Sequence, residues 1–476
     1  MRQLRDCLVK TSRSVSLPIR ISEWSRVPLH DLTEEMRREI EQAADGWRQQ
    51  NGLPAAPLSF AGHGGNLLCT RQYVGVVEVN GVVVEIYPKL DASLIDADEA
   101  ERLPPSAKID SVMRNLLWIL EVADYRDLAE AQTAHLEEAP TSFFDLFAFL
   151  LGKNLLPELE RGVPHTYLAF EDDLKTVRGR IGFVQQVTLN WNRFDRVHCT
   201  WDEFTPNIAI NRLLKCACRF LSRRVNYPEA ARLLLSCEVL LADVEDVSAV
   251  TALRDVANLR FDRSIDRFRT AFDLARRLLA GIGHDLGAGS AKTFVFLLDM
   301  NRLFERYVHA VLESHFVGVS VEEQKAVGDL LRIQPGGIRQ VADYSWRDSS
   351  TYWIGDAKYK HLAKGHSHAL RFSELEGQSE SSDDLAPLAN QMISAADIRQ
   401  LTVYAELVRL GESLAKAPEL MLLYPFIGSQ LECLPDSVTA WNGSRFWLMP
   451  VLVKAQTSVG DAIRFPAPQG ALAGAD

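Results

Sequence analysis

The spacing of apolar positions changes along the chain, and each spacing predicts a different kind of element. Near the N-terminus, two runs rich in β-branched residues, 73–79 and 82–87, flank Asn80 and Gly81. An Asn-Gly pair between two such runs is the strongest short signal for a two-residue β-hairpin. We therefore expect residues 1–108 to form a β-rich N-terminal accessory domain that ends in an acidic, proline-containing linker.

From about Ile109 the apolar residues recur every three to four positions, which is typical of helices. This spacing predicts helices around residues 112–120 and 143–151 and from 207 to about 279, with a mixed stretch at 162–187. The glycine-rich segment 281–290 is typical of a domain boundary. We expect residues 109–280 to form a middle domain of helices and strands.

The C-terminal part alternates between the two spacings, which favours an α/β domain over residues 281–465. Its predicted elements are a helix at 292–316, strands within 327–359, a polar loop at 360–389, a helix at 395–410, and strands at 419–424 and 444–453. The tail, 466–476, is predicted to be disordered. The whole chain is thus expected to be a multidomain α+β protein.

Composition narrows the class of protein. The net charge is −11, yet residues 161–225 hold eleven Lys or Arg against six Asp or Glu. Because a DNA-binding protein usually carries a basic surface, contact with DNA would be local or would need a partner. Apolar runs stay short of the ~18 residues of a membrane helix, and the seven cysteines are scattered. We expect a cytoplasmic protein with reduced thiols, no membrane partner and no zinc site.

One strand–turn–strand pattern carries candidate chemistry. It comprises residues 341–346, 347–350 and 351–359. With the turn centred there, Asp343 faces Ile354, and alternation along the strands places Asp343, Asp356 and Lys358 on one face. The two aspartates would then lie diagonally, ~7–8 Å apart between Cα atoms, within reach of one cation.

Two carboxylates beside a lysine suit phosphodiester hydrolysis. Asp343 and Asp356 would hold Mg²⁺, with Mn²⁺ as the alternative, and Lys358 would orient a water or stabilise transition-state charge. This D…DxK arrangement resembles the core of the PD-(D/E)xK nuclease superfamily, with Ala342 in place of the proline. Alone the motif is weak, because charged residues at a strand end are usually only solvated.

Two flanking features add to the motif. Glu305 falls on the apolar stripe of a predicted helix, with Leu298, Val308 and Leu312, and is a fourth catalytic candidate; a salt bridge to an arginine is the alternative. Gln400 and Tyr404 are adjacent on a predicted helix and match the QxxxY pair of RecB-like nucleases as supporting residues. An ordinary helix face with a core tyrosine would give the same pattern.

Across most of its length the chain resembles the McrC family. The resemblance rests on an ordered series of blocks: 114–120 (RNLLWIL), 144–149 (FDLFAF) through 161–162 (RG), 178–181 (RGRI), 207–214 (NIAINRLL), 299–305 (DMNRLFE), 342–343 (AD), 355–359 (GDAKY) and 397–404 (DIRQLTVY). Residues 73–75 and 86–89 resemble the additional N-terminal domain of longer family members. Each block is weak, but the whole order is specific.

The resemblance implies a function and a partner. McrC-like proteins supply the nuclease of a two-part antiviral restriction system whose partner is a McrB-like hexameric AAA+ GTPase, usually the reader of modified DNA. It also implies a finger that enters the motor ring, here at about 162–181, with Arg178 and Arg180 as candidate contacts; these could instead face DNA. The chain itself is expected to bind no nucleotide, because Leu286 and Ala291 replace the glycines of a phosphate loop.

Three other interpretations remain open at this stage. The chain could be a RecB-like DNA-processing or repair nuclease with no role in restriction. It could be a non-catalytic adaptor that activates a AAA+ motor. The intact set Glu305, Asp343, Asp356 and Lys358 argues against a degenerate nuclease domain in such an adaptor. The chain could also be an α/β protein with coincidental motifs, although the ordered blocks argue against this.

Overall fold

The structure is a computed structural model that describes residues 18–465 with internal gaps. The gaps are residues 54, 63, 92–93, 95–100, 104–108, 125–139, 283–292, 333–336, 349–350, 361–394, 415, 429–430, 432–435, 441 and 456. The predicted disordered tail, most of the predicted polar loop and most of the glycine-rich segment therefore lie outside the described residues.

The chain divides into two compact units, and one of them is discontinuous in sequence. Unit 1 combines Met1–Ala139 with Leu297–Asp476, and unit 2 is the segment between them, Pro140–Phe296. This division differs from the three predicted domains, whose boundaries fall at 108 and 280. The N-terminal and C-terminal segments of the chain thus build one body.

The first part of unit 1 is β-rich, as expected, and also contains a helix that the apolar pattern did not reveal. Its elements are β1 (Ile19–Ser22), β2 (Arg26–Pro28), α1 (Glu34–Gln50), β3 (Leu58–Ala61), β4 (Leu67–Thr70), β5 (Tyr73–Val79), β6 (Val82–Tyr87) and α3 (Ile109–Asp124). The predicted hairpin is confirmed: Val79 pairs with Val82, and Asn80 and Gly81 both have positive φ, as a two-residue turn requires.

Helix α3 belongs to unit 1 although its sequence pattern placed it in the middle domain. It packs against α10, a helix of the C-terminal segment. Asn115 on α3 donates to the carbonyl of Leu90 at 2.7 Å and accepts from the amide of Ala455 at 2.9 Å. This buried amide therefore joins the two sequence segments of the unit.

A six-stranded mixed sheet forms the centre of the C-terminal segment, in the order β11-β12-β13-β14-β16-β15. The elements of this segment are β10 (Thr293–Asp299), α10 (Met300–His315), β11 (Glu322–Arg332), β12 (Gly337–Arg347), β13 (Tyr352–Ala357), α12 (Ala395–Gly411), β14 (Glu419–Phe426), β15 (Asp436–Thr439), β16 (Arg445–Leu452) and a short 3-10 helix, Val459–Ala462. Helix α12 packs with Ile354 in the apolar core on one face, and α10 contacts the face that carries Tyr344.

The helix predicted at 292–316 is correct only in its second half. Residues 293–299 form strand β10, and the helix begins at Met300. The run TFVFLLD is rich in aromatic and β-branched residues, which favour a strand. The Asp299 side chain accepts the amide of Asn301 at 3.1 Å and so caps the helix at this point.

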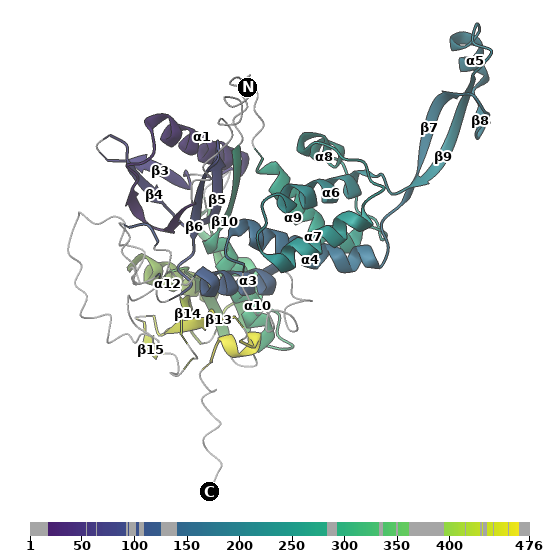
Figure 1. The fold of residues 1–476 in the computed structure, drawn as a ribbon. Coiled ribbons are helices and arrows are strands. Elements are labelled where there is room, and N and C mark those ends of the chain that lie inside the picture. Colours follow the sequence, from purple (N-terminus) through teal and green to yellow (C-terminus); the bar gives the residue numbers. More distant parts are fainter. Residues whose placement is uncertain are drawn as a thin grey trace, which may run out of the picture. The chain divides into compact units, whose positions relative to one another are not determined.

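Unit 2 is a helical body with a projecting ribbon of two long strands and a short third strand (Figure 1). Its elements are α4 (Phe143–Glu160), β7 (Thr166–Leu174), β8 (Arg180–Ile181), α5 (Phe183–Leu189), β9 (Val197–Thr205), α6 (Ala209–Ser222), α7 (Pro228–Leu240), α8 (Ala249–Asp255), a short 3-10 helix, Asp266–Phe268, and α9 (Arg269–Ala280). Residues 166–205, which we call the finger, extend beyond the predicted 162–181 because β9 supplies the second long strand.

Helix α4 lies at the centre of the helical body, where it packs against α6, α7 and α9. Its residues are apolar almost all the way round, which is typical of a fully buried helix. Asp145 in its first turn is buried and accepts the amides of Asn226 and Tyr227 at 2.7 and 2.9 Å. The buried charge thus orders the start of α7.

The described residues also bear on the predictions about membrane helices and cysteines. Within those ranges, none of the helices is long and apolar enough to cross a membrane. The five cysteines in the described part of the chain are free thiols.

Gly152 should be essential for the close approach of α4 and α7. A Cβ at this position would lie 2.6 Å from the Leu233 Cβ atom, too close for either helix to remain in place. We expect Gly152→Ala to lower the free energy of unfolding of unit 2 by about 1–3 kcal/mol, despite the better helix propensity of alanine. The matched control is Gly46→Ala in α1, where nothing lies within 4 Å and a slight stabilisation is expected. Urea unfolding followed by circular dichroism measures both; equal effects would contradict the packing argument.

Candidate functional site

Strands β12 and β13 bring the predicted aspartates together, but in a register different from the expected one. Tyr344 pairs with Gly355 and Ser345 with Ile354, so Asp343 does not face Ile354; the prediction was wrong by two residues. The turn starts at Asp348 because its carboxylate accepts the amide of Thr351 at 3.0 Å. A shift of two residues keeps every side chain on its predicted face.

The two strands separate where the site begins. The pairing of the two strands ends at Tyr344 and Gly355, and the amide of Ala357 donates to Asp343 Oδ2 at 3.0 Å. Gln324 on β11 donates to the other carboxylate oxygen of Asp343 at 3.3 Å. Asp343 is therefore held by neighbours on both sides.

Asp356 and Lys358 form an ion pair at the end of β13, in which the aspartate is buried and the lysine half-buried. Lys358 Nζ lies 2.7 Å from Asp356 Oδ2, and the aspartate is only 2% exposed. The same Oδ2 atom accepts no well-directed hydrogen bond within the described part of the chain. A buried carboxylate in this condition retains capacity for a further positive partner.

Glu305 reaches the same place from helix α10. The Tyr344 hydroxyl donates to the backbone carbonyl of Glu305 at 2.6 Å and so fixes the helix on the sheet. Gly355 makes room for this, since a Cβ there would lie 3.2 Å from the Tyr344 ring. The charge of Arg302, on the same helix, also acts on Glu305 and lowers its pKa, but less than burial raises it.

The charges of the cluster, Glu305, Asp343, Asp356 and Lys358, affect one another. Burial, followed by the charge of Asp343, raises the pKa of Asp356 to about 7. Burial and the Glu305 carboxylate raise the pKa of Asp343, and burial together with Asp299 raises that of Glu305. Burial alone would lower the pKa of Lys358, but the charges of Asp356 and Asp343 outweigh this effect, and the pKa is raised. The site thus concentrates carboxylates whose ionised forms are disfavoured without added positive charge.

Helix α12 supplies the supporting pair and a residue that sequence reasoning missed. Gln400 Nε2 lies 2.6 Å from the Tyr404 hydroxyl, and Tyr404 is buried in the core. The pKa of Tyr404 is raised, mainly by burial and also by the charges of the cluster. Asp397, three residues before Gln400 and on the same side of the helix, pairs with Lys360 Nζ at 2.8 Å. That spacing within the DIRQ block was the signal that could have identified it.

The donor set fits a hard divalent cation that keeps most of its water. Carboxylate oxygens are the ligands that Mg²⁺ uses, and it is commonly held by one or two of them. In the described residues no three His, Cys, Asp or Glu side chains converge as a metal-binding group. The available ligands are therefore the pair Asp343 and Asp356, of which Asp356 has the buried oxygen with spare capacity.

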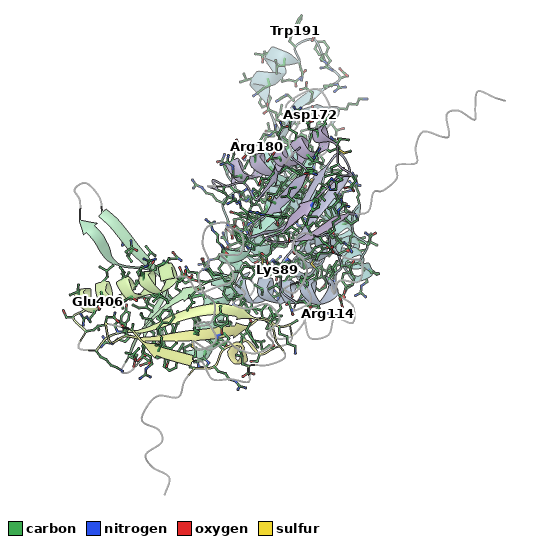
Figure 2. The ribbon with its side chains drawn as sticks, turned by 90° about the vertical axis from the view of Figure 1, so that its left-hand side faces the viewer. Lys89, Arg114, Asp172, Arg180, Trp191 and Glu406 are labelled. Carbon is green, nitrogen blue, oxygen red and sulfur yellow. The ribbon has the colours of Figure 1, made fainter. Side chains whose placement is uncertain are left out.

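The finger is the second candidate region, because it exposes large apolar side chains. Figure 2 shows Trp191 at its end, where the side chain is 70% exposed. The other exposed apolar residues of the tip are Phe183, Val184, Val187, Leu189 and Phe194. Soluble surfaces rarely gather so many, and such a patch is typical of a surface that contacts another molecule.

The two predicted arginines differ in their surroundings. Arg178 pairs with Glu203 at 3.1 Å and stacks over the Trp201 ring, 4.9 Å from its centroid. Arg180 is exposed on β8, which pairs with β9. Gly179 between them has a positive φ, and a Cβ there would lie 2.4 Å from the Thr200 carbonyl oxygen, which explains the glycine of the RGRI block.

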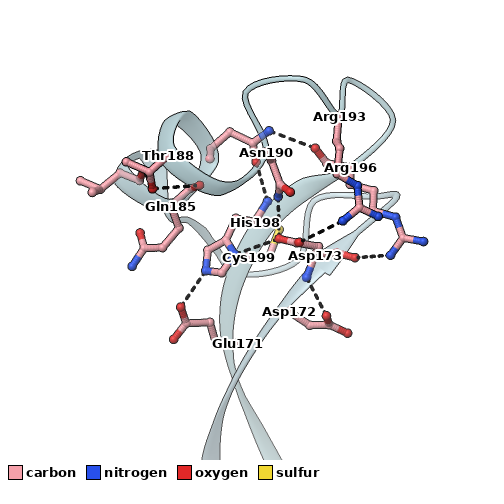
Figure 3. A network of polar contacts seen from close by, with 12 residues as sticks. Glu171, Asp172, Asp173, Gln185, Thr188, Asn190, Arg193, Arg196, His198 and Cys199 are labelled. Carbon is pink, nitrogen blue, oxygen red and sulfur yellow. Dashed lines mark hydrogen bonds and ion pairs between the residues drawn. The ribbon is translucent and has the colours of Figure 1, made fainter.

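A polar network holds the tip of the finger together (Figure 3). His198 Nδ1 lies 2.9 Å from Asp173 Oδ1, and His198 Nε2 lies 2.7 Å from Glu171 Oε1. Both ring nitrogens can donate only when the imidazole is protonated. Asn190 also donates to Asp173 at 2.6 Å, so this carboxylate joins β7, β9 and the turn after α5.

One family model matches most of the chain, and one solved structure shares its fold. The family described as “McrBC 5-methylcytosine restriction system component” matches residues 68–425. The fold is similar to a chain of the Thermococcus gammatolerans McrB AAA+ hexamers with bound McrC: TM-score 0.61, 17% identity, 93% of this chain and 97% of that chain covered. The Thermococcus gammatolerans McrBC complex matches with TM-score 0.42 and 20% identity over 63% of this chain and 88% of that one. A search of curated proteins found no match.

His198 should titrate above an ordinary histidine. Hydrogen bonds to Asp173 and then Glu171 raise its pKa. Because the folded value is raised, its contribution to the stability of the finger is complete below ~6.5 and is lost as the pH rises through the folded value. NMR titration of ¹³C-labelled histidines measures this, and Asp173→Asn should lower the value. A wild-type pKa at or below ~6.5 would contradict the doubly bonded imidazolium.

Proposed function

Because the chain belongs to the family of McrBC 5-methylcytosine restriction system components, we propose that it is the metal-dependent DNA endonuclease subunit of a two-part restriction system. The observation that carries this proposal is that Asp343, Asp356 and Lys358 lie together where β12 and β13 separate, with Glu305 of α10 near enough for its charge to raise the pKa of Asp343. A set of this composition at the opening between two strands suits hydrolysis of a phosphodiester.

The cation would be held by Asp343 and Asp356, with Mg²⁺ as the expected ion and Mn²⁺ as the alternative. When bound, it would polarise the phosphodiester and lower the pKa of a coordinated water. Lys358, fixed 2.7 Å from Asp356, is placed to orient the attacking water and to stabilise the charge that develops on the phosphate. Glu305, half-buried and with a raised pKa, is placed to exchange a proton with that water.

The supporting residues of α12 act on the other side of the site. Tyr404 and Gln400 hydrogen-bond to each other beside the cluster, and the pair fixes the helix against the sheet. Gln400 is half-buried and suitable for contact with the DNA strand, whereas the buried Tyr404 supports it from the core. Their removal should weaken substrate positioning more than it disturbs the cation.

The expected partner is a McrB-like hexameric AAA+ GTPase. The chain of similar fold comes from an assembly in which McrB AAA+ hexamers are bound to McrC. The finger is the surface that suits such a contact, because it projects from unit 2 and exposes apolar side chains at its end. Arg180 is exposed and available to a partner, whereas Arg178 is engaged by Glu203 and Trp201.

DNA, expected to be modified and double-stranded, would be delivered with the help of the motor. The net charge of the chain is −11, which opposes strong binding to DNA by this subunit alone. A RecB-like nuclease without a motor would need its own basic surface. The charge balance and the finger therefore favour the restriction complex over a free-standing repair nuclease.

Cleavage by the assembled complex tests the catalytic assignment. With its McrB-like partner, GTP, Mg²⁺ and methylated or unmethylated DNA, the wild-type chain should cut, and Asp356→Ala or Lys358→Ala should reduce the rate by about 10²–10³-fold. The matched control is Lys325→Ala on β11, which removes a lysine of the same sheet that pairs with Glu322. Cutting that persists in Asp356→Ala would overturn the site. Loss of cutting by the wild type with intact stimulation of GTP hydrolysis would favour the adaptor interpretation.

Stimulation of the partner tests the finger separately. Arg180→Ala should reduce the GTP hydrolysis that this chain elicits from the motor by about fivefold or more, the expected effect of losing one charge-assisted hydrogen bond. Arg254→Ala, an exposed arginine of unit 2 outside the finger, is the control and should leave the stimulation unchanged. Equal stimulation by wild type and Arg180→Ala would remove this arginine from the interface.

A further inference from the structure

The backbone that carries Lys358 is anchored from two directions after it leaves the sheet. The Lys358 amide donates to the carbonyl of Leu423 at 2.8 Å, which is its last contact with β14. The next residue, Tyr359, is buried, and its hydroxyl donates to Glu23 Oε1 at 2.7 Å. The residue after that, Lys360, pairs with Asp397 of α12.

Glu23 comes from the opposite end of the sequence. It lies between β1 and β2, is 1% exposed, and accepts the backbone amide of Lys89 at 2.8 Å with the same oxygen that receives the Tyr359 hydroxyl. Its own amide donates to the carbonyl of Tyr87 at 2.9 Å. Burial raises the pKa of Glu23 to about 7, although the hydrogen bonds of Tyr359 and Lys89 oppose this.

Burial of the Glu23 carboxyl costs free energy of folding. Glu23 Oε2 is buried and accepts no hydrogen bond from the described residues, so the carboxyl is incompletely satisfied. An apolar residue at this position would avoid that penalty. What the carboxyl provides in return is one strong, directional contact that fixes the buried hydroxyl of Tyr359.

Tyr359 is also in contact with the helix that carries Glu305. Its ring lies 5.8 Å from that of Phe304, centroid to centroid, and Phe304 directly precedes Glu305. The position of the Tyr359 ring therefore affects the positions of two members of the cluster. It affects Lys358 through the backbone and Glu305 through α10.

We propose that Glu23 is a positioning residue of the catalytic site, which holds Tyr359 and thereby sets the place of Lys358 beside Asp356. This inference rests on the proposed nuclease function. It assigns the N-terminal strands a role in catalysis: they are a structural part of the nuclease unit and not an accessory domain.

The first experiment measures the position of Lys358 without requiring nuclease activity. The full-length chain is treated briefly with acetic anhydride, and mass spectrometry gives the acetylation of Lys358 relative to Lys325 on β11. Tyr359→Phe and Glu23→Ala should raise this ratio about fivefold, the effect of losing one hydrogen bond. Glu23→Gln keeps the acceptor oxygen and should stay within about twofold of wild type.

The matched control is Tyr87→Phe. Tyr87 is also buried and donates to a glutamate, Glu85, at 2.8 Å in the same unit, but it does not adjoin the catalytic lysine. Tyr87→Phe should leave the Lys358 ratio unchanged. An unchanged ratio in Tyr359→Phe, or an equal rise in Tyr87→Phe, would overturn the proposal. A defect in Glu23→Gln without one in Tyr359→Phe would also overturn it, because the charge would then act by another route.

The second experiment relates the position to catalysis. In the complex with the motor, Tyr359→Phe should lower kcat for DNA cleavage by about fivefold or more, with KM for DNA and the stimulation of GTP hydrolysis unchanged. A change in KM with constant kcat would contradict a role in positioning the lysine. If the wild type does not cut DNA but acetylation of Lys358 responds as expected, the structural link stands and the nuclease assignment fails.

Discussion

The ion pair between the buried carboxylate of Asp356 and the half-buried Lys358 is the interaction that several elements of unit 1 hold in place. Removing the lysine would leave the buried carboxylate without its positive partner, which is costly. The surrounding residues therefore have to fix both ends. Asp343 holds the amide of Ala357 where the strand ladder stops, and Tyr359 and Lys360 fix the chain beyond the lysine. Because the pairing of β12 and β13 ends at Tyr344 and Gly355, the Asp343 carboxylate takes the place of a backbone acceptor for the amide of Ala357.

The finger is stabilised by local contacts along the ribbon and at its tip. The finger consists of two long strands and the two-residue strand β8, without a second layer to form a core, and a two-stranded hairpin is marginally stable alone. Here cross-strand aromatic pairs, such as Phe170 with Trp201 and Tyr167 with Phe204, stabilise the stem, and the carboxylates around His198 fix the tip. These contacts leave the apolar side chains of α5 and the following turn in solvent. A ribbon held by local contacts is therefore able to present a preformed surface to a partner without a supporting layer behind it.

The spacing of residues along the chain predicted most helices and strands of the site. The strand register and the contacts between distant residues could not be predicted in this way. The hairpin at Asn80 and Gly81, helices α3 and α12, and the shared face of Asp356 and Lys358 follow from spacing alone. The register of β12 and β13 did not, because it depends on the Asp348 side chain in the turn. Strand β10 was predicted as helix because a short apolar run looks the same in both forms. Glu23 and Tyr359 are 336 positions apart, and no periodicity reports such a contact.

Because unit 1 is built from two separate segments of the sequence, some of its buried contacts can form only after the second segment has been synthesised. Unit 2 is inserted between its two segments, and the contacts of Asn115 with Ala455 and of Glu23 with Tyr359 close the unit across that insertion. During synthesis the N-terminal strands are made first, but Glu23 cannot receive its donor until the chain has passed Tyr359. Burial of the Glu23 carboxyl without the Tyr359 hydroxyl would destabilise the N-terminal segment. The site is thus complete only when both segments have folded onto each other, which couples the formation of the cluster to the folding of the whole unit.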